Sequence, residues 1–366
     1  MFGMDKFFSF FSHDIGIDLG TANTLVWVKG KGVVIREPSV VALHRKTKQL
    51  IAIGTEAKKM MGKTPSSILV IRPLKGGIIS DFDATAAMIG YYIKELHESG
   101  GIFSKFLSRP KVVIGIPSSV TEVERRAVWE AALTAGARQA YLIEEPMAAA
   151  IGANISVFSP TGAMIVDIGG GTTEIAVISL GGIVISKSLK VAGDDMDKAI
   201  VHYIRLRHGL LIGEKNAEEV KIKIGSAFKD PKIERRLIRS EGGKPGEEKV
   251  AIVRGRDIET GLPKSIRLTE ADVREALAPI IAEIIEAITQ VIEDTPPELT
   301  SDVLENGIFL TGGGAKLEGI DHLVIDRTHI SVIIADDPLT TVVRGTGKVL
   351  DDVKLLNRVK VVGGLQ

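Results

Sequence analysis

The stretch MIVDIGGGTTE, residues 164–174, runs from apolar residues through one aspartate into three glycines and two threonines. A buried strand needs neither a carboxylate at its end nor so much backbone freedom after it, so this composition indicates a functional turn. The stretch GIDLGTANTL, residues 16–25, repeats the pattern nearer the start of the chain. The matching pairs are Asp18 with Asp167, Gly20 with Gly169, and Thr24 with Thr173. The chain therefore sends an apolar strand into an Asp-x-Gly turn twice.

The glycines of these turns predict a phosphate site. A glycine-rich turn lets backbone N–H groups converge, and such turns bind anions, above all phosphates. A carboxylate beside phosphates would repel them unless a cation lay between, and Mg²⁺ suits this place because it keeps several waters and bridges to phosphate oxygens. Two such turns facing each other across a cleft would hold a Mg-nucleotide from both sides. An ordinary strand end with a capping aspartate is the alternative, but the further stretch LTGGGAKL at 310–317 favours the nucleotide.

Composition and length set the outer bounds. At 366 residues, with 45% hydrophobic residues, the chain is long for one core and predicts two domains or a bilobal fold. The 46 basic residues balance 46 acidic ones, which argues against nucleic-acid binding by bulk positive charge. The chain has no cysteine, which fits the cytoplasm and excludes cysteine metal sites. No P-loop, dinucleotide, zinc-peptidase or serine-hydrolase motif occurs in it.

Apolar segments alternate with amphipathic ones along the chain, which predicts an α/β fold with largely buried sheets. Each half starts with an antiparallel β-meander, at about residues 14–38 and 164–191, and continues into helices, which indicates an internal duplication. Thr121 with Glu124, and Thr269 with Asp272, have capping-box spacing and predict helix starts. Residues 232–256 predict two strands around an exposed loop rich in glycine, proline and glutamate.

The first residues, MFGMDKFFSFFSHD, carry large apolar side chains at helical spacing. Met4, Phe7, Phe8 and Phe11 follow the i, i+3, i+4, i+7 pattern and would share one helix face. We interpret residues 1–13 as an amphipathic segment that binds a membrane surface. Packing on the domain and a start without fixed structure are the alternatives, whereas a signal peptide is disfavoured because serines interrupt the apolar run. The stretch GGIFSKFL is a second candidate anchor, with Ile102, Phe103, Phe106 and Leu107.

These motifs resemble those of a known superfamily. IDLGTANT, VDIGGGTTE and LTGGGA are similar to the two phosphate motifs and the adenosine motif of the actin, sugar kinase and heat-shock chaperone ATPases. IRPLKGGIISDF, LIEEPMAAAIGA and DPLTTVVRGTGK resemble the MreB family of bacterial actins, and the likeness covers nearly the whole chain. It implies an actin-like ATPase fold of two duplicated lobes, each a mixed β-sheet flanked by helices. Lobe I would hold 14–153 and about 335–366, with a small subdomain at about 40–72, and lobe II 154–334, with one at about 192–260.

The resemblance also implies roles for the phosphate side of the site, with ATP or ADP and Mg²⁺ as ligands. Asp18 and Asp167 would lie near Mg²⁺ and act mainly through water. Glu145 would orient or deprotonate the attacking water, because phosphoryl transfer depends above all on positioning. Its alternative role is that of a carboxylate at a helix N-terminus, and Glu144 is the second candidate. The residues whose backbone would surround the phosphates are Gly20, Thr21, Ala22, Asn23, Gly169, Gly170, Gly171 and Thr172.

On the adenosine side, the residues implied are Gly312, Gly313, Gly314 and Ala315. A side chain there would block close approach of the ligand, although a tight strand-to-helix turn also explains the glycines. Glu218 and Lys221 match the family's contacts to ribose and adenine, and their i, i+3 spacing equally fits an exposed ion pair. Asp194 and Asp197 resemble the phosphate-side turn of the second lobe, and Asp197 alternatively caps a helix.

The function implied by the resemblance is that of a polymerising ATPase. ATP would close the lobes, monomers would stack head to tail, and assembly would make Glu145 productive, so that hydrolysis is slow. The filament would lie on the inner face of the cytoplasmic membrane and organise cell-wall elongation to maintain rod shape. Self-association, RodZ, MreC, MreD and the peptidoglycan elongation machinery are the implied partners, without nucleic acid.

Three other functions found among related proteins fit this sequence less well. A small-molecule kinase would need a substrate pocket with a carboxylate base, and no distinctive sugar-recognition insert is visible in the sequence. A chaperone would continue into a β-rich substrate domain, whereas this chain ends soon after VKLLNRVKVVGG. The division protein FtsA typically places its membrane helix last, whereas the apolar helix predicted here comes first. The polymerising ATPase is therefore preferred, with the kinase as the alternative.

Overall fold

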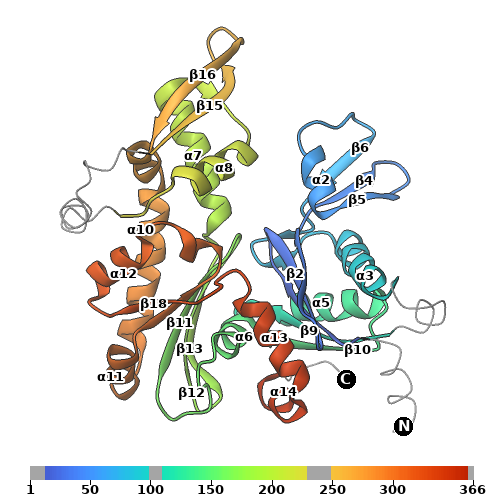
Figure 1. Ribbon diagram of the computed structural model, residues 1–366, viewed down its shortest axis with the longest axis vertical. Helices are drawn as coiled ribbons and strands as arrows, with labels where there is room; N and C mark the ends of the chain where they lie inside the picture. Colours follow the sequence, from blue (N-terminus) through green and yellow to red (C-terminus); the bar gives the residue numbers. More distant parts are fainter. Residues whose placement is uncertain (1–12, 99–108, 229–248, 362–366) are drawn as a thin grey trace.

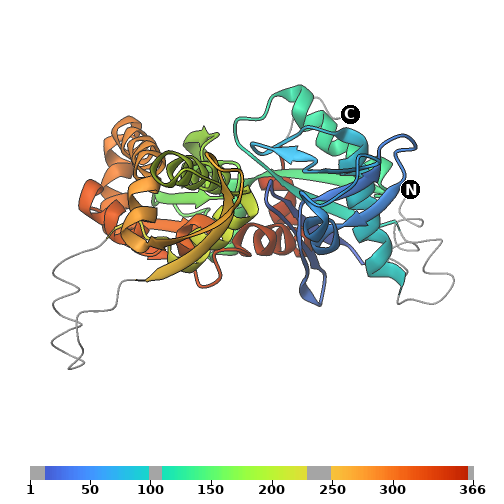
Figure 2. The ribbon, with the colours of Figure 1, turned by 90° about the horizontal axis from the view of Figure 1, so that it is seen from above.

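The fold is taken from a computed structural model, which describes residues 13–98, 109–228 and 249–361. Figure 1 shows two lobes side by side, each with a sheet and helices, which meet at their base. The view from above in Figure 2 separates the two lobes equally clearly. The predicted bilobal α/β fold is therefore confirmed.

The sheet of lobe I has β1 (Ile15–Leu19) at its centre. An antiparallel meander runs from β1 through β2 (Asn23–Val28) to β3 (Gly32–Pro38), as the sequence predicted. On the other side, β9 (Lys111–Ile116) pairs parallel with β1, and β10 (Gln139–Glu144) pairs parallel with β9. Asp18 thus stands near the end of the central strand.

The sheet of lobe II repeats this order. Its central strand β11 (Ala163–Ile168) begins an antiparallel meander through β12 (Thr173–Ser179) to β13 (Gly182–Leu189). On the other side, β17 (Ile308–Thr311) and β18 (Val332–Ile334) continue the sheet in parallel. Because the two orders correspond strand by strand, the predicted duplication is confirmed, and Asp167 occupies the position in lobe II that Asp18 has in lobe I.

Small sheets form the upper part of each lobe in Figure 1. On lobe I, β4 (Val41–His44) pairs with β5 (Leu50–Ile53) and β6 (Ile68–Ile71), beside α2 (Gly54–Met60). A short hairpin of β7 (Leu74–Lys75) and β8 (Ile78–Ile79) follows. On lobe II, α7 (Gly193–His208) and α8 (Glu214–Ile224) pack against β14 (Leu210–Leu211) and β15 (Val250–Asp257), and β16 (Pro263–Thr269) completes that sheet.

The strands predicted for residues 232–256 are described only in part. β15 is the second of them, and it pairs with β16 across a turn at residues 258–262. The first predicted strand falls within 229–248, outside the described residues. β16 was not predicted from the sequence, because its alternation of polar and apolar residues is short, with only Ile266 and Leu268 buried.

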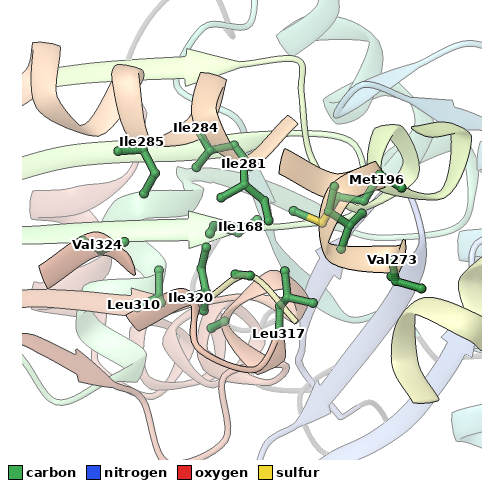
Figure 3. Packing of buried hydrophobic residues seen from close by; sticks show 14 of the residues in the cluster. Ile168, Met196, Val273, Ile281, Ile284, Ile285, Leu310, Leu317, Ile320 and Val324 are labelled. Atoms are coloured by element: carbon green, nitrogen blue, oxygen red, sulfur yellow. The ribbon is translucent and has the colours of Figure 1, made fainter. Parts of the chain in front are cut away.

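Both predicted capping boxes are confirmed. Thr121 and Glu124 exchange side-chain and backbone hydrogen bonds at the start of α5 (Glu122–Thr134), and Thr269 and Asp272 do so at the start of α10 (Glu270–Asp294). α3 (Phe82–Glu98) packs beside α5, while α11 (Pro297–Asn306) and α12 (Ile320–Thr328) belong to lobe II. Figure 3 shows Ile281, Ile284 and Ile285 of α10 in one apolar cluster with Ile168 and Met196 in the core of lobe II. Burying each such side chain contributes about 1.5–3 kcal/mol.

The base of the molecule is one core that both lobes share. α6 (Glu145–Gly152) packs against β9 and β10 of lobe I and against β11 and β12 of lobe II. α13 (Thr341–Asp351) crosses α6, and α14 (Val353–Val359) follows it. The crossing brings backbone against backbone: a β-carbon on Gly152 would lie 1.8 Å from the Thr341 carbonyl oxygen, and one on Gly345 1.8 Å from that of Ala148. These two helices therefore join the two lobes at their base.

Within the described residues, no helix combines the length and the apolar character needed to cross a bilayer. The candidate membrane residues Met4, Phe7, Phe8 and Phe11 lie outside the described residues, as do Ile102, Phe103, Phe106 and Leu107.

Candidate functional site

A cavity of about 580 Å³ lies between the lobes, within the usual size range of small-molecule sites. Both Asp-x-Gly turns line it, together with the first residue of α6, the start of α7 and one face of α8. The predicted site residues that line it are Asp18, Gly20, Thr21, Ala22, Asn23, Glu145, Asp167, Gly169, Gly170, Gly171, Thr172, Glu218, Lys221, Gly312, Gly313 and Gly314. Ala315 is buried and does not border the cavity, and neither does Glu144.

The two turns touch each other across the cavity. A β-carbon on Gly170 would lie 2.5 Å from the Ala22 β-carbon, and one on Gly171 would lie 2.5 Å from the Thr21 hydroxyl oxygen. Real β-carbons essentially never come so close, so the approach of the turns requires glycine at both positions. The repeated motif in the sequence is therefore a facing pair in space.

The start of α7 holds the turn of lobe II in place. The Gly169 N–H donates to the Thr172 carbonyl oxygen at 2.9 Å and closes the turn. The N–H groups of Gly193 and Asp194 donate to the carbonyl oxygens of Gly169 and Gly170 at 3.2 and 2.7 Å. Because the Gly169 N–H donates inside the turn, the backbone donors available to an anion are those of the following residues.

Several carboxyl groups gather at the cavity: Asp18 and Asp167 border it, and Glu174 is buried near them. Burial raises the pKa of Asp18 to about 7. Burial, followed by the charges of Asp18 and Glu174, raises the pKa of Asp167 to about 8. Glu174 itself is buried and accepts hydrogen bonds from the Ser188 hydroxyl at 2.5 Å and the Ser118 N–H at 3.1 Å. So many acidic groups in one buried place call for a cation.

The carboxyl groups suit a cation whose other ligands come from water and from the bound phosphates. Among the described residues, no group of three or more His, Cys, Asp and Glu side chains could hold a metal ion. Asp18 and Asp167 alone therefore fit an ion such as Mg²⁺ that is completed by water and phosphate oxygens, and they do not form a closed protein cage.

Glu145 occupies a position suited to catalysis. It is the first residue of α6, directly before Pro146, and its side chain is buried yet borders the cavity. Burial, followed by the charges of Glu174, Asp18 and Asp167, raises its pKa well above the ordinary range. Burial also raises the pKa of Glu144, but Arg125 acts in the opposite direction and that side chain lies away from the cavity.

The three glycines after β17 have different reasons to be glycine. Gly312 has φ +82°, and a β-carbon there would lie 2.2 Å from an Asp167 carboxylate oxygen. A β-carbon on Gly314 would lie 2.2 Å from Ile168. On Gly313, the nearest atom would be a Leu339 methyl carbon at 3.5 Å, an ordinary contact. The tight turn therefore explains Gly312 and Gly314, while Gly313 is left to face the cavity.

The charged residues of α7 and α8 do not pair as the simple sequence alternatives proposed. Lys221 contacts Asp197 at 2.8 Å and donates to the Gly193 carbonyl oxygen at 2.7 Å. Glu218 instead pairs with Lys58 of lobe I. Asp197 lies inside α7 and does not cap it; Asp195 accepts the Ala192 N–H at 3.2 Å in that role. The two alternative predictions, an exposed Glu218–Lys221 ion pair and a helix cap at Asp197, are therefore both wrong.

Sequence reasoning missed the wall formed by the chain after β18. Pro338, Leu339 and Val342 border the cavity, as do Gly77 and Met196. Pro338 is tied to Gly312, whose N–H donates to the Pro338 carbonyl oxygen at 2.9 Å. The segment DPLTTVVRGTGK resembles the MreB family, but the approach of its start to the glycine turn has no local sequence signal.

Known proteins resemble this chain in sequence and structure. A family profile described as MreB/Mbl protein matches residues 12–358. The cell shape-determining protein Mbl of Bacillus subtilis is 46% identical over 351 residues, 96% of this chain and 99% of that protein. The cell shape-determining protein MreB of Escherichia coli is 47% identical, over 95% and 96% of the two chains. The crystal structure of MreB5 of Spiroplasma citri bound to ADP has a TM-score of 0.84 and 38% identity, covering 94% and 98%. The MamK double helical filament, at 23% identity and a TM-score of 0.74, shares the fold.

Proposed function

Because this chain belongs to the MreB/Mbl family, we propose that it binds ATP between its lobes, polymerises into actin-like filaments and determines rod cell shape. The observation that carries the proposal is the cavity in which two Asp-x-Gly turns face each other beside the buried Glu145. The names of the relatives, cell shape-determining proteins, support the cytoskeletal function. They do not favour the small-molecule kinase.

Nucleotide binding uses both lobes. The phosphates lie between the turns at residues 20–23 and 169–172, where backbone N–H groups other than that of Gly169 supply donors and glycine allows close approach. The adenosine lies against Gly313, between Glu218 and Lys221 on one side and Leu339 on the other, all of which border the cavity. Structures of MreB5 of Spiroplasma citri bound to ADP and to AMPPNP support a nucleotide in this fold.

Hydrolysis depends on Glu145, which orients a water molecule and accepts its proton. A carboxylate with a raised pKa is a stronger base, and burial beside other acids gives Glu145 this property. Asp18 and Asp167 would hold Mg²⁺, which when bound would neutralise charge on the phosphates. The remaining contribution is position: the facing turns fix the phosphates relative to the first residue of α6.

Assembly and hydrolysis are coupled through α6. This helix carries Glu145 at its first residue and packs against strands of both lobes. A rotation of one lobe against the other therefore moves Glu145 relative to the phosphates. Head-to-tail stacking fixes that rotation, so ATP turns over slowly in the monomer and faster in the filament.

The filament works at the inner face of the cytoplasmic membrane. The apolar spacing of Met4, Phe7, Phe8 and Phe11 supports an amphipathic anchor that lies on the bilayer. One short helix binds lipid weakly, but a filament presents many of them at high effective concentration. RodZ, MreC, MreD and the peptidoglycan elongation machinery are the proposed partners there.

A sedimentation assay tests the proposed function. The full chain is incubated with Mg-ATP, with Mg-ADP or without nucleotide, and both the pelleted fraction and the released phosphate are measured. We expect sedimentable polymer and phosphate release with ATP. Gly313→Leu should fill the adenosine space and abolish the ATP effect, whereas Gly213→Leu, at a position with no atom within 4 Å of an added β-carbon, should keep it. ADP release that depends on a sugar and occurs without polymer would favour the kinase instead.

The membrane anchor is tested separately by flotation with liposomes. A chain lacking residues 1–12, or carrying Phe7→Ser and Phe8→Ser, should polymerise with ATP but no longer float. If the deleted chain floats as well as the wild type, the anchor lies elsewhere, and the stretch at 100–107 is the next candidate.

A further inference from the structure

Two ion pairs join the upper parts of the lobes. Lys58 of α2 lies 2.7 and 3.0 Å from the two carboxylate oxygens of Glu218 on α8. Arg72, directly after β6, lies 2.8 Å from a carboxylate oxygen of Asp194 in the first turn of α7. In each pair the cation comes from lobe I and the carboxylate from lobe II. We call these two contacts the clasp.

The clasp is the kind of contact that can open. At the base, side chains of α6, α13 and both large sheets form one shared apolar cluster. Higher up, the described apolar clusters stay within their own lobes, around Ala57 on one side and Val220 on the other. The four clasp side chains keep 20–25% exposure, so water can replace their partners when the pairs separate. Rotation about the shared base would therefore separate the two ion pairs of the clasp without exposing an apolar core.

The same carboxylates also form the wall of the cavity. Asp194 and Glu218 border it, whereas their partners Lys58 and Arg72, on the opposite lobe, do not. The charge of Glu218 also acts on Arg72 and helps to raise its pKa, after that of Asp194, against the opposing effect of burial. Opening of the lobes thus frees both carboxylates at once and uncovers the cavity between them.

We propose that Lys58 and Arg72 are positioning residues of the nucleotide cycle: through Glu218 and Asp194 they hold the lobes closed over the cavity and set the rate at which nucleotide enters and leaves. This inference rests on the proposed nucleotide function. Each partly exposed pair should slow exchange about threefold, and the two together about tenfold.

The test measures exchange of a fluorescent N-methylanthraniloyl-ATP on the full chain with Mg²⁺ by stopped flow. The variants are Lys58→Met, Arg72→Met and their double variant. Lys59→Met is the matched control, because Lys59 lies on the same helix but pairs with Glu56 within it, at 63% and 71% exposure. Arg72→Lys keeps the charge and should stay near the wild-type rate. If a methionine variant fails to fold, Lys58→Gln and Arg72→Gln replace it.

The proposal requires that association and dissociation both become about tenfold faster in the double variant, with little change in their ratio. Added salt should speed exchange in the wild type and leave the double variant unchanged. Wild-type exchange rates in the double variant would overturn the proposed role of the clasp. So would a faster dissociation alone, since this is the result of a lost contact to the nucleotide. A wild-type chain that does not bind the probe would instead overturn the nucleotide function on which the clasp depends.

Discussion

Replacing Gly345 with alanine tests the close backbone contact between α13 and α6 at the base of the lobes. The added β-carbon would lie 1.8 Å from the Ala148 carbonyl oxygen and 2.6 Å from its carbonyl carbon. A close carbon–oxygen contact is about 3.3 Å, so α6 and α13 would have to separate by roughly 1.5 Å. Alanine gains about 1 kcal/mol of helix propensity over glycine, while overpacking costs about 1–3 kcal/mol and occasionally more. Because both sides of this contact are backbone, we expect the upper end of that cost and a net loss of about 2 kcal/mol.

Urea unfolding of the full chain, followed by circular dichroism, measures this loss. Gly213→Ala is the matched control, since a β-carbon there meets no atom within 4 Å. The displacement of α6 should also slow phosphate release, because Glu145 begins that helix. If Gly345→Ala unfolds at the same urea concentration as the wild type and the control, the close crossing of α6 and α13 is refuted.

Three further predictions concern the site. Glu145→Ala should bind ATP and form polymer but release phosphate about a hundredfold or more slowly. Glu144→Ala should release phosphate at the wild-type rate, and the reverse result would move the catalytic role to Glu144. Without metal and nucleotide, the wild type should lose stability as pH rises from 6 to 8.5. In the folded chain the pKa values of Asp18 and Asp167 are raised to about 7 and 8. These carboxyl groups therefore keep protons that the unfolded chain has already released, and the folded state loses this advantage as they ionise. Asp167→Asn should flatten that fall in thermal unfolding midpoint, and a midpoint that rises over this range in the wild type would contradict the raised pKa values. Lys221→Met should cost about 3 kcal/mol by leaving the buried Asp197 carboxylate without its partner, and added Asp197→Asn should restore most of it; a single variant as stable as the wild type would show that the pair contributes nothing.

The large sheets and the facing turns could be predicted because their signals are local. Apolar runs separated by glycine-containing turns predict both meanders. The Asp-x-Gly motif occurs at the same place in each of them, around Asp18 and Asp167. The capping boxes at Thr121 and Thr269 depend on residues three positions apart, so they too are visible in the sequence. In each case the residues that specify the structure lie within one element or turn.

The charge pairs at the cavity could not be predicted, because their partners come from distant parts of the chain. The Glu218–Lys221 spacing suggests an ion pair within one helix. In the folded chain, however, Lys221 pairs with Asp197 and Glu218 pairs with Lys58. The reason for glycine at 312 and 314 is likewise tertiary, since the neighbours are Asp167 and Ile168 of β11. A sequence pattern shows which residues are polar or small, but not which distant atoms they meet.

A cryo-EM map of filaments grown from the full chain with Mg²⁺ and AMPPNP tests the central claim most directly. The claim predicts nucleotide density in the cavity between the lobes, with the phosphates between residues 20–23 and 169–172 and the adenosine against Gly313. It would be contradicted by ordered filaments whose cavity is empty, or by nucleotide bound anywhere else on the chain.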